Sequence, residues 1–411
     1  MIRHLAFFEA LGSLGENSDA ARRVTAGLVV LRLVDDVCLH ELLGPRNVSI
    51  ALRPVAEAVA VLRDPDRAGR DLSAILQLIG RSTGPIDRAA MGELLLAYGR
   101  TLDLEANWEL AADVFQTAAE IAPATAPAIG IDADTMLGAA ARRAGEWDAS
   151  SDAYARAVHT ASVAGDLRRA LKAEVGLANN DFARGNLPAA DEMLDSVMAD
   201  ARTNGFSDVT ALALHTRASV AHHRGHYADA VELAYDALTL TTDESARDVI
   251  LTDIGSAFAE LGMRDAARDA HLIASVTSRS PMVRGLATLN LMELASLDGM
   301  EEAFDTYAAA VAHMPLEARF RAYYLLYFAQ GEQRLGRVQA AARSLQQAKQ
   351  FAAGNGMHQV LFEAEAALAT LAGASSAPVA IRAEPAPKIP DSARRIAGEL
   401  TQMRELALAG R

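Results

Sequence analysis

Basic and amide side chains in the middle of the chain are the residues best suited to chemistry with a partner. Arg142 and Arg143 adjoin one another, and Lys172 and Asn179 follow in the next stretch of helical pattern. Guanidinium and ammonium groups bind carboxylates and phosphates, and an amide both donates and accepts hydrogen bonds. The sequence therefore predicts that these four residues converge on an acidic group of a ligand.

A group of histidines raises the question of a metal site. His215, His222, His223 and His226 are close in sequence, and histidines four residues apart on a helix can share an ion. A predicted turn at Gly225 breaks that spacing, and neither a cysteine nor a nearby carboxylate completes a tetrahedral shell. No nucleophile elbow, phosphate loop or zinc-protease motif occurs in its required context. We expect no metal, no cofactor and no enzymatic activity.

Helix geometry extends the set of candidate binding residues. If helix pairs stack side by side, the first helix of each pair lines a concave groove with the residues of one face. The predicted groove residues are Arg142, Arg143, Lys172, Asn179, His215, Ser219, His222, His223, Gln330 and Arg334. They would make the groove polar and locally basic. For each residue taken singly, an ordinary solvated helix face is the alternative.

Internal repetition organises most of the chain, and it is clearest in residues 212–240. There a helix, a turn at Gly225 and a second helix with Ala230, Ala234 and Ala237 follow one another, so the second helix can approach a neighbour closely. Equivalent turns recur every 36 to 40 residues, at Ala106, Gly145, Gly185, Gly225, Gly262, Asp298 and Gly336. Twelve residues beyond the turns lie Ala118, Ala157, Val197, Ala237, Ala274, Ala310 and Ala348. Such units need neighbours to bury their apolar faces.

One unit carries a recognisable motif, which consists of Leu137, Gly138, Gly145, Trp147, Ser150, Tyr154 and Ala157. This pattern resembles the tetratricopeptide repeat over about 90–354. The resemblance implies an all-α, right-handed α-solenoid of antiparallel helix pairs, with about seven repeats plus N-terminal helices. The long unit is similar to repeats of bacterial regulatory proteins, including MalT-like activators and Rap-type regulators. Some relatives clamp a peptide carboxylate with Lys, Asn and Arg, but this chain lacks the clamp positions.

Composition agrees with helices and limits the partners. The chain is 51% hydrophobic but only 5% aromatic, which suits closely packed Ala- and Leu-rich helices. A net charge of −14 argues against a nucleic-acid partner, because phosphate contacts need clustered Lys and Arg. Cys38 is the single cysteine, so no internal disulfide can form. No apolar run is long enough to span a membrane, and no signal peptide is recognisable, so we expect a soluble, cytoplasmic protein.

The chain divides into four parts. These are N-terminal helices that cap the stack or form degenerate repeats (1–90), the repeat stack (91–372), a Pro- and Ala-rich linker (373–390) and a short amphipathic helix (391–411). Within the first part we expect helices at 19–43, 48–62 and 72–79.

The C-terminal helix gathers Ile396, Leu400, Met403 and Ala407 on one face. A short amphipathic helix on a linker is seldom stable alone, so we expect it to dock. Four alternatives stay open: it occupies the groove, it mediates self-association, it is an unbound tail, or it begins a further domain.

Two functional hypotheses follow. The first is a non-enzymatic scaffold that binds a peptide or helix of a partner protein in the groove. The second is a ligand- or peptide-responsive sensor of a bacterial signalling or transcription regulator, in which binding changes the curvature of the stack.

Overall fold

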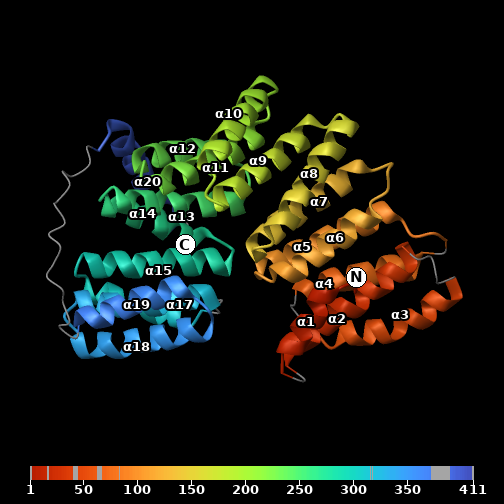
Figure 1. Ribbon diagram of the computed structural model, residues 1–411, viewed down its shortest axis with the longest axis horizontal. Helices are drawn as coiled ribbons and strands as arrows, with labels where there is room; N and C mark the ends of the chain where they lie inside the picture. Colours follow the sequence, from red (N-terminus) through yellow and green to blue (C-terminus); the bar gives the residue numbers. More distant parts are fainter. Residues whose placement is uncertain are drawn as a thin grey trace. The chain divides into compact units, whose positions relative to one another are not determined.

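The computed structural model describes residues 2–15, 18–39, 45–62, 67–82, 84–314, 316, 318–371 and 389–409 (Figure 1). In these residues the fold is all-α, without strands, and consists of antiparallel helix pairs that follow one another along the chain, as predicted. The chain forms two compact units, 1–209 and 210–411. Most of the predicted linker at 373–390 lies outside the described residues.

The first unit begins with N-terminal helices and continues with three helix pairs. Its elements are α1 (Leu5–Ser13), α2 (Asp19–Val34), the π-helical turn η1 (Asp35–Leu39), α3 (Pro45–Ala60), α4 (Arg67–Arg81), α5 (Arg88–Leu104), α6 (Trp108–Ile121), α7 (Pro127–Ala144), α8 (Trp147–Ala164), α9 (Leu167–Ala183) and α10 (Leu187–Thr203). The predicted helix at 19–43 is therefore wrong in one respect: the α-helical geometry of α2 gives way to a π-helix at Asp35.

The second unit continues the series. α11 (Ser207–His223) begins at the end of the first unit, and it is followed by α12 (Tyr227–Leu240), α13 (Glu244–Glu260), α14 (Arg264–Thr277), α15 (Pro281–Leu297), α16 (Glu301–Ala312), α17 (Ala318–Arg334), α18 (Val338–Gly354), α19 (His358–Leu371) and α20 (Asp391–Ala409). From α5 to α18, odd-numbered helices are the first helices of pairs and even-numbered helices are the second.

Ring-on-glycine packing sets the close approach of helices in both units. Gly99 of α5 lies under the ring of Phe115 on α6, and Gly255 of α13 lies under the ring of His271 on α14. A Cβ atom at either glycine would overlap the ring, so only glycine admits the neighbour at this spacing. His271 thus takes the place that Phe115 fills in the earlier repeat.

The predicted repeat phase fails at one turn. The left-handed backbone conformation of the turn lies at Gly299, with φ of 68°, and not at Asp298, which caps α15. The small buried position twelve residues on is correspondingly Val311, which is fully buried, whereas Ala310 is exposed. Glycine takes positive φ without the steric penalty of a side chain, which explains why the turn follows it.

Among the helices of the described chain, none is both long and apolar enough to cross a membrane.

Candidate functional site

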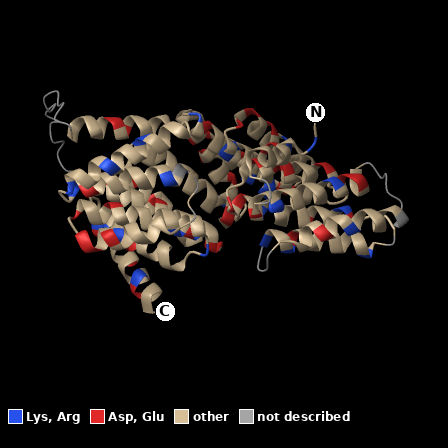
Figure 2. Ribbon diagram, turned by 90° about the horizontal axis from the view of Figure 1, so that it is seen from below, with Lys and Arg blue, Asp and Glu red and all other residues tan. Residues whose placement is uncertain are grey.

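Ion pairs connect successive first helices at intervals of one repeat. In the first unit the pairs are Asp103 with Arg143, Asp132 with Arg169, and Asp208 with Lys172. The nitrogen–oxygen distances are 2.8 Å for Arg169 and 2.6 Å for Lys172. We call these pairs, together with the equivalent pairs within the second unit, the first-helix ladder. Figure 2 shows the mixture of basic and acidic residues along the helices.

Several of the basic residues predicted for the groove are already paired with acidic residues of the ladder. Arg143 and Lys172 are 38% and 39% exposed, but each contacts a carboxylate of a neighbouring first helix. Burial disfavours the charged form of Asp208, yet Lys172 and Arg168 outweigh that effect and hold the pKa of Asp208 below its usual range. An acidic ligand would therefore have to replace a carboxylate already in place.

Arg142 and Asn179 have different neighbours. The Nε atom of Arg142 is buried and has no hydrogen-bond partner among the described residues, while its guanidinium charge acts on the buried phenol of Tyr154. The amide of Asn179 donates to the backbone oxygen of Val175 at 3.1 Å, within its own helix. The four basic and amide residues predicted to converge thus lie on α7 and α9 and contact separate groups.

Equivalent pairs lie within the second unit. The Nε2 atom of His215 on α11 lies 2.7 Å from Asp253 of α13. Arg334 of α17 donates to the hydroxyl of Ser296 on α15 at 3.0 Å and lies 3.8 Å from Glu293. His215 and Arg334 therefore occupy ladder positions, as Arg143 and Lys172 do.

The other predicted residues of the second unit do not take part in the ladder. Ser219 donates to the backbone oxygen of His215 at 3.2 Å. The rings of His222 and Tyr227 meet edge-on, with 5.2 Å between their centroids. The Nε2 atom of His222 is buried and has no hydrogen-bond partner in the described part of the chain. His223 is exposed at the end of α11, and Gln330 is half-buried on α17. Among described residues, no group of three or more His, Cys, Asp or Glu converges as a metal site would.

α20 packs against α12 and α14, which are second helices (Figure 1). Ala393, Ile396 and Leu400 are buried there. We call the α12–α14 surface under α20, including Glu232, Tyr235 and Asp269, the α20 seat. The hypothesis that this helix occupies the groove of first helices is therefore wrong.

Polar contacts fix α20 in register. Thr401 and Arg404 each donate to the carboxylate of Asp269 at 2.7 Å, Tyr235 donates to Glu399, and Ser392 donates to Glu232. Sequence reasoning missed Asp269, although an acid flanked by Ala266, Ala267, Ala270 and His271 on a buried helix face was a visible signal.

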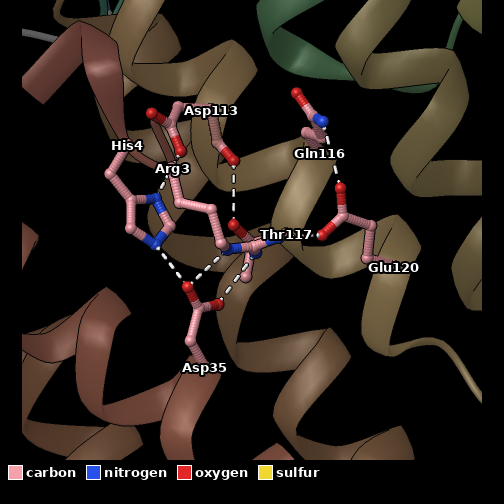
Figure 3. Close-up of polar contacts among 7 residues, drawn as sticks. All are labelled: Arg3, His4, Asp35, Asp113, Gln116, Thr117 and Glu120. Carbon is pink, nitrogen blue, oxygen red and sulfur yellow. Dashed lines mark hydrogen bonds and ion pairs between the residues drawn. The ribbon is translucent and has the colours of Figure 1, made fainter. Parts of the chain in front are cut away.

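A second charge cluster, centred on the buried side chains of His4 and Asp35, holds the N-terminus to η1 and α6 (Figure 3). Arg3 donates to both oxygens of Asp35, at 2.5 and 2.8 Å, and to Glu120 at 2.6 Å. The ring of His4 lies between Asp113, at 2.6 Å, and Asp35, at 3.0 Å. Burial disfavours the charged ring, but the two carboxylates outweigh it and raise the pKa of His4 to about 9. A protonated, buried imidazole of this kind is a structural cation and not a catalytic base.

Comparison with known proteins gives fold-level likenesses only. No protein-family model matches the sequence, and no curated protein has a detectably similar sequence. The chain is similar to BtubC from P. vanneervenii, with 12% identity, a TM-score of 0.37, and 54% of this chain and 88% of that one covered. It is also similar to the Rap conjugation gene regulator of plasmid pLS20, solved with the Phr* peptide. The sequence identity is 11% and the TM-score 0.45, and the match covers 86% of this chain and 97% of that one. For NprR in complex with its cognate peptide NprX, the sequence identity is 13% and the TM-score 0.45, and the match covers 75% of this chain and 96% of that one.

Proposed function

We propose that this protein is a non-enzymatic interaction scaffold that binds an extended peptide or a helix of a partner protein along its first helices. The observation that carries the proposal is the first-helix ladder. Its charged side chains are partly exposed and recur from repeat to repeat. Surface ion pairs of this kind contribute only about 0–1 kcal/mol each, so a ligand can open them at low cost.

The ladder favours a partner that carries spaced acidic groups. Each guanidinium can bind a carboxylate through two parallel hydrogen bonds, so an incoming Asp or Glu side chain can replace the carboxylate of the neighbouring helix. Arg143, Arg169 and Lys172 lie on two successive first helices, α7 and α9. A peptide lying across these helices would meet one basic group after another.

A sensor of a signalling or transcription regulator is the second candidate. It is favoured by the position of the ladder, because each pair joins two adjacent repeats. A ligand that breaks the Lys172–Asp208 pair would loosen the contact between α9 and the first turn of α11, both within the first unit. Small changes of this kind at repeat interfaces alter the curvature of stacked helical repeats.

The test is selection of peptides from a displayed library rich in Asp and Glu, followed by affinity measurement with fluorescent versions of the enriched peptides. We expect the double variant Arg143→Glu/Lys172→Glu to bind at least about tenfold more weakly, which corresponds to about 1.4 kcal/mol. The control Arg53→Glu/Arg279→Glu changes net charge equally at two highly exposed arginines and should bind as the wild type does. Equal losses in both variants, or no enriched peptide, would exclude the ladder as the binding surface.

A further inference from the structure

We propose that the α20 seat is a binding site for an amphipathic helix of a partner protein, and that α20 is its resident occupant, which the partner displaces. This goes beyond the peptide-binding surface above, because the seat lies on second helices and takes a helix of different chemistry. The partner helix it fits carries the α20 face: a small residue, two apolar anchors, and a Thr and an Arg on the following turn.

The apolar part of the α20 contact is small. Ala393, Ile396 and Leu400 are buried, whereas Leu406, near the end of the helix, is 75% exposed and Leu408 is also exposed. Figure 2 shows this end of the helix extending away from the body of the unit. Two large anchors give a modest driving force, and the ordering of a helix opposes it. A helix held this way can be exchanged for another.

The polar part of the contact makes the seat selective. With α20 in place Asp269 is 5% exposed, and within the described chain the hydrogen bonds to its carboxylate come from Thr401 and Arg404 of α20 alone. A helix that covered the seat without offering a cation would bury this carboxylate unpaired, which is strongly unfavourable. The seat therefore rejects a helix that has only apolar residues, and it accepts one that brings a cation to Asp269.

The same repeat position already serves as an anchor elsewhere in the chain. Asp269 is the seventh residue beyond the turn at Gly262, and Asp113 is the seventh beyond the turn at Ala106. Asp113 binds the His4 side chain of the N-terminal segment, 2.6 Å away. Glu232, seventh beyond Gly225, accepts from Ser392 of α20. Acids at this position of three second helices, α6, α12 and α14, thus bind the two terminal segments of the chain, which lie outside their own repeats.

The experiment uses the full chain with Ile396→Asp and Leu400→Asp, which removes the apolar anchors of α20 and empties the seat. The probe is a fluorescent synthetic peptide of residues 389–411. We expect it to bind this variant at least about tenfold more tightly than wild type, whose seat is filled. A peptide with Arg404→Ala should bind about tenfold more weakly, and Asp269→Asn in the receptor should cause the same loss.

A designed helix tests whether the seat recognises a face and not one sequence. This peptide keeps the residues at the Ala393, Ile396, Leu400, Thr401 and Arg404 positions on an otherwise unrelated helical sequence. We expect it to displace the labelled 389–411 peptide from the emptied chain. Failure to compete, or no loss with the Arg404→Ala peptide, would overturn the proposal.

A second experiment uses the wild-type sequence of α20, in case the Ile396→Asp/Leu400→Asp variant misfolds. A protease site placed within 373–388 of the wild-type chain allows the covalent tether to be cut while α20 is seated. Excess labelled 389–411 peptide should then exchange into the cut chain and not into the uncut one. No exchange would overturn the proposal. So would a wild-type dimer, seen by light scattering, that dissociates on Asp269→Asn, because α20 would then be an oligomer contact.

Discussion

The two ends of the chain are anchored at the same position of two different repeats, but with very different support. His4 lies against Asp113, and Arg404 lies against Asp269. Both acids are seventh beyond a repeat turn and lie on second helices, α6 and α14. The polar contacts are equally short, so the difference between the ends must come from what surrounds them.

The N-terminal anchor is part of a core. Phe7 is fully buried, Arg3 adds three further hydrogen bonds, and His4 is held in the left-handed conformation with φ of 58°. That conformation costs about 1–2 kcal/mol for a non-glycine residue and persists only where its surroundings fix it. The C-terminal helix has two large buried anchors. One repeat position thus serves a fixed cap at one end and an exchangeable helix at the other.

The largest effect is expected from breaking the N-terminal anchor. Asp35→Ala leaves Arg3 and the protonated, buried His4 without their shared carboxylate, which should lower the free energy of unfolding by about 3–5 kcal/mol. Both tryptophans, Trp108 and Trp147, lie in the first unit, so urea unfolding followed by tryptophan fluorescence reports on it. Glu57→Ala, at an exposed surface pair, is the control. A loss below about 1 kcal/mol would show that the cluster is not an anchor.

The next effect is a difference between the two units in how their stability depends on pH. The pKa of His4 is raised to about 9, so its stabilisation is complete below the ordinary value of 6.5 and is lost as the pH rises through 9. Burial lowers the pKa of His271 to about 4, so the unfolded chain takes up that proton first, and stability is lost as the pH falls from 6.5 to 4. Each unit of pKa shift corresponds to about 1.4 kcal/mol.

Two readouts separate these responses. Tryptophan fluorescence should show the first unit weakening in alkali, and hydrogen exchange of α13 and α14 should show the second weakening in acid. His271→Phe, which copies Phe115 of the earlier repeat, should remove the acid response that arises at this site. An unchanged acid response in His271→Phe would assign it to other groups.

A smaller effect is expected at the α20 seat. Tyr235→Phe removes one hydrogen bond to Glu399 and keeps the ring, so α20 should be weakened by about 0.5–1.5 kcal/mol. Faster hydrogen exchange in 391–409, with α12 unchanged, would measure this. Exchange that accelerates equally in α12 would show that α20 and its seat open as one unit.

The smallest effect is expected in the first-helix ladder. Arg143→Ala removes one partly exposed pair with Asp103, and it should change the free energy of unfolding by no more than about 1 kcal/mol. The measurement is the same fluorescence titration. A loss of 3 kcal/mol or more, as in a buried pair, would mean that the ladder is structural and closed to a ligand.

Local pattern sufficed to predict the helix pairs, because a small residue, a turn and a helical apolar face recur within a few tens of residues. It misplaced the turn at Asp298, where Gly299 supplies the positive φ. The binding residues were less accessible to such reasoning. Arg143 and Lys172 were recognised as basic, but their partners Asp103 and Asp208 lie a full repeat away.

The terminal anchors depend on contacts that no local pattern contains. His4 meets Asp113 across more than one hundred residues, and Arg404 meets Asp269 across a similar distance in sequence. Amphipathicity shows that the C-terminal helix needs a surface, but it does not say which surface. The Asp269 carboxylate, which accepts hydrogen bonds from Thr401 and Arg404, helps to select the surface, and this contact is visible only in the folded structure.

Hydrogen exchange of the unmodified full chain, followed segment by segment, tests the central contrast most directly. We predict that 391–409 exchanges through a local opening, well before α12 and α14, while 5–13 exchanges together with α2 and α6. Adding excess 389–411 peptide should accelerate exchange in the chain's own α20 and leave 5–13 unaffected. If 391–409 is as protected as α14 and insensitive to the peptide, then α20 is a fixed part of the fold and the account is contradicted.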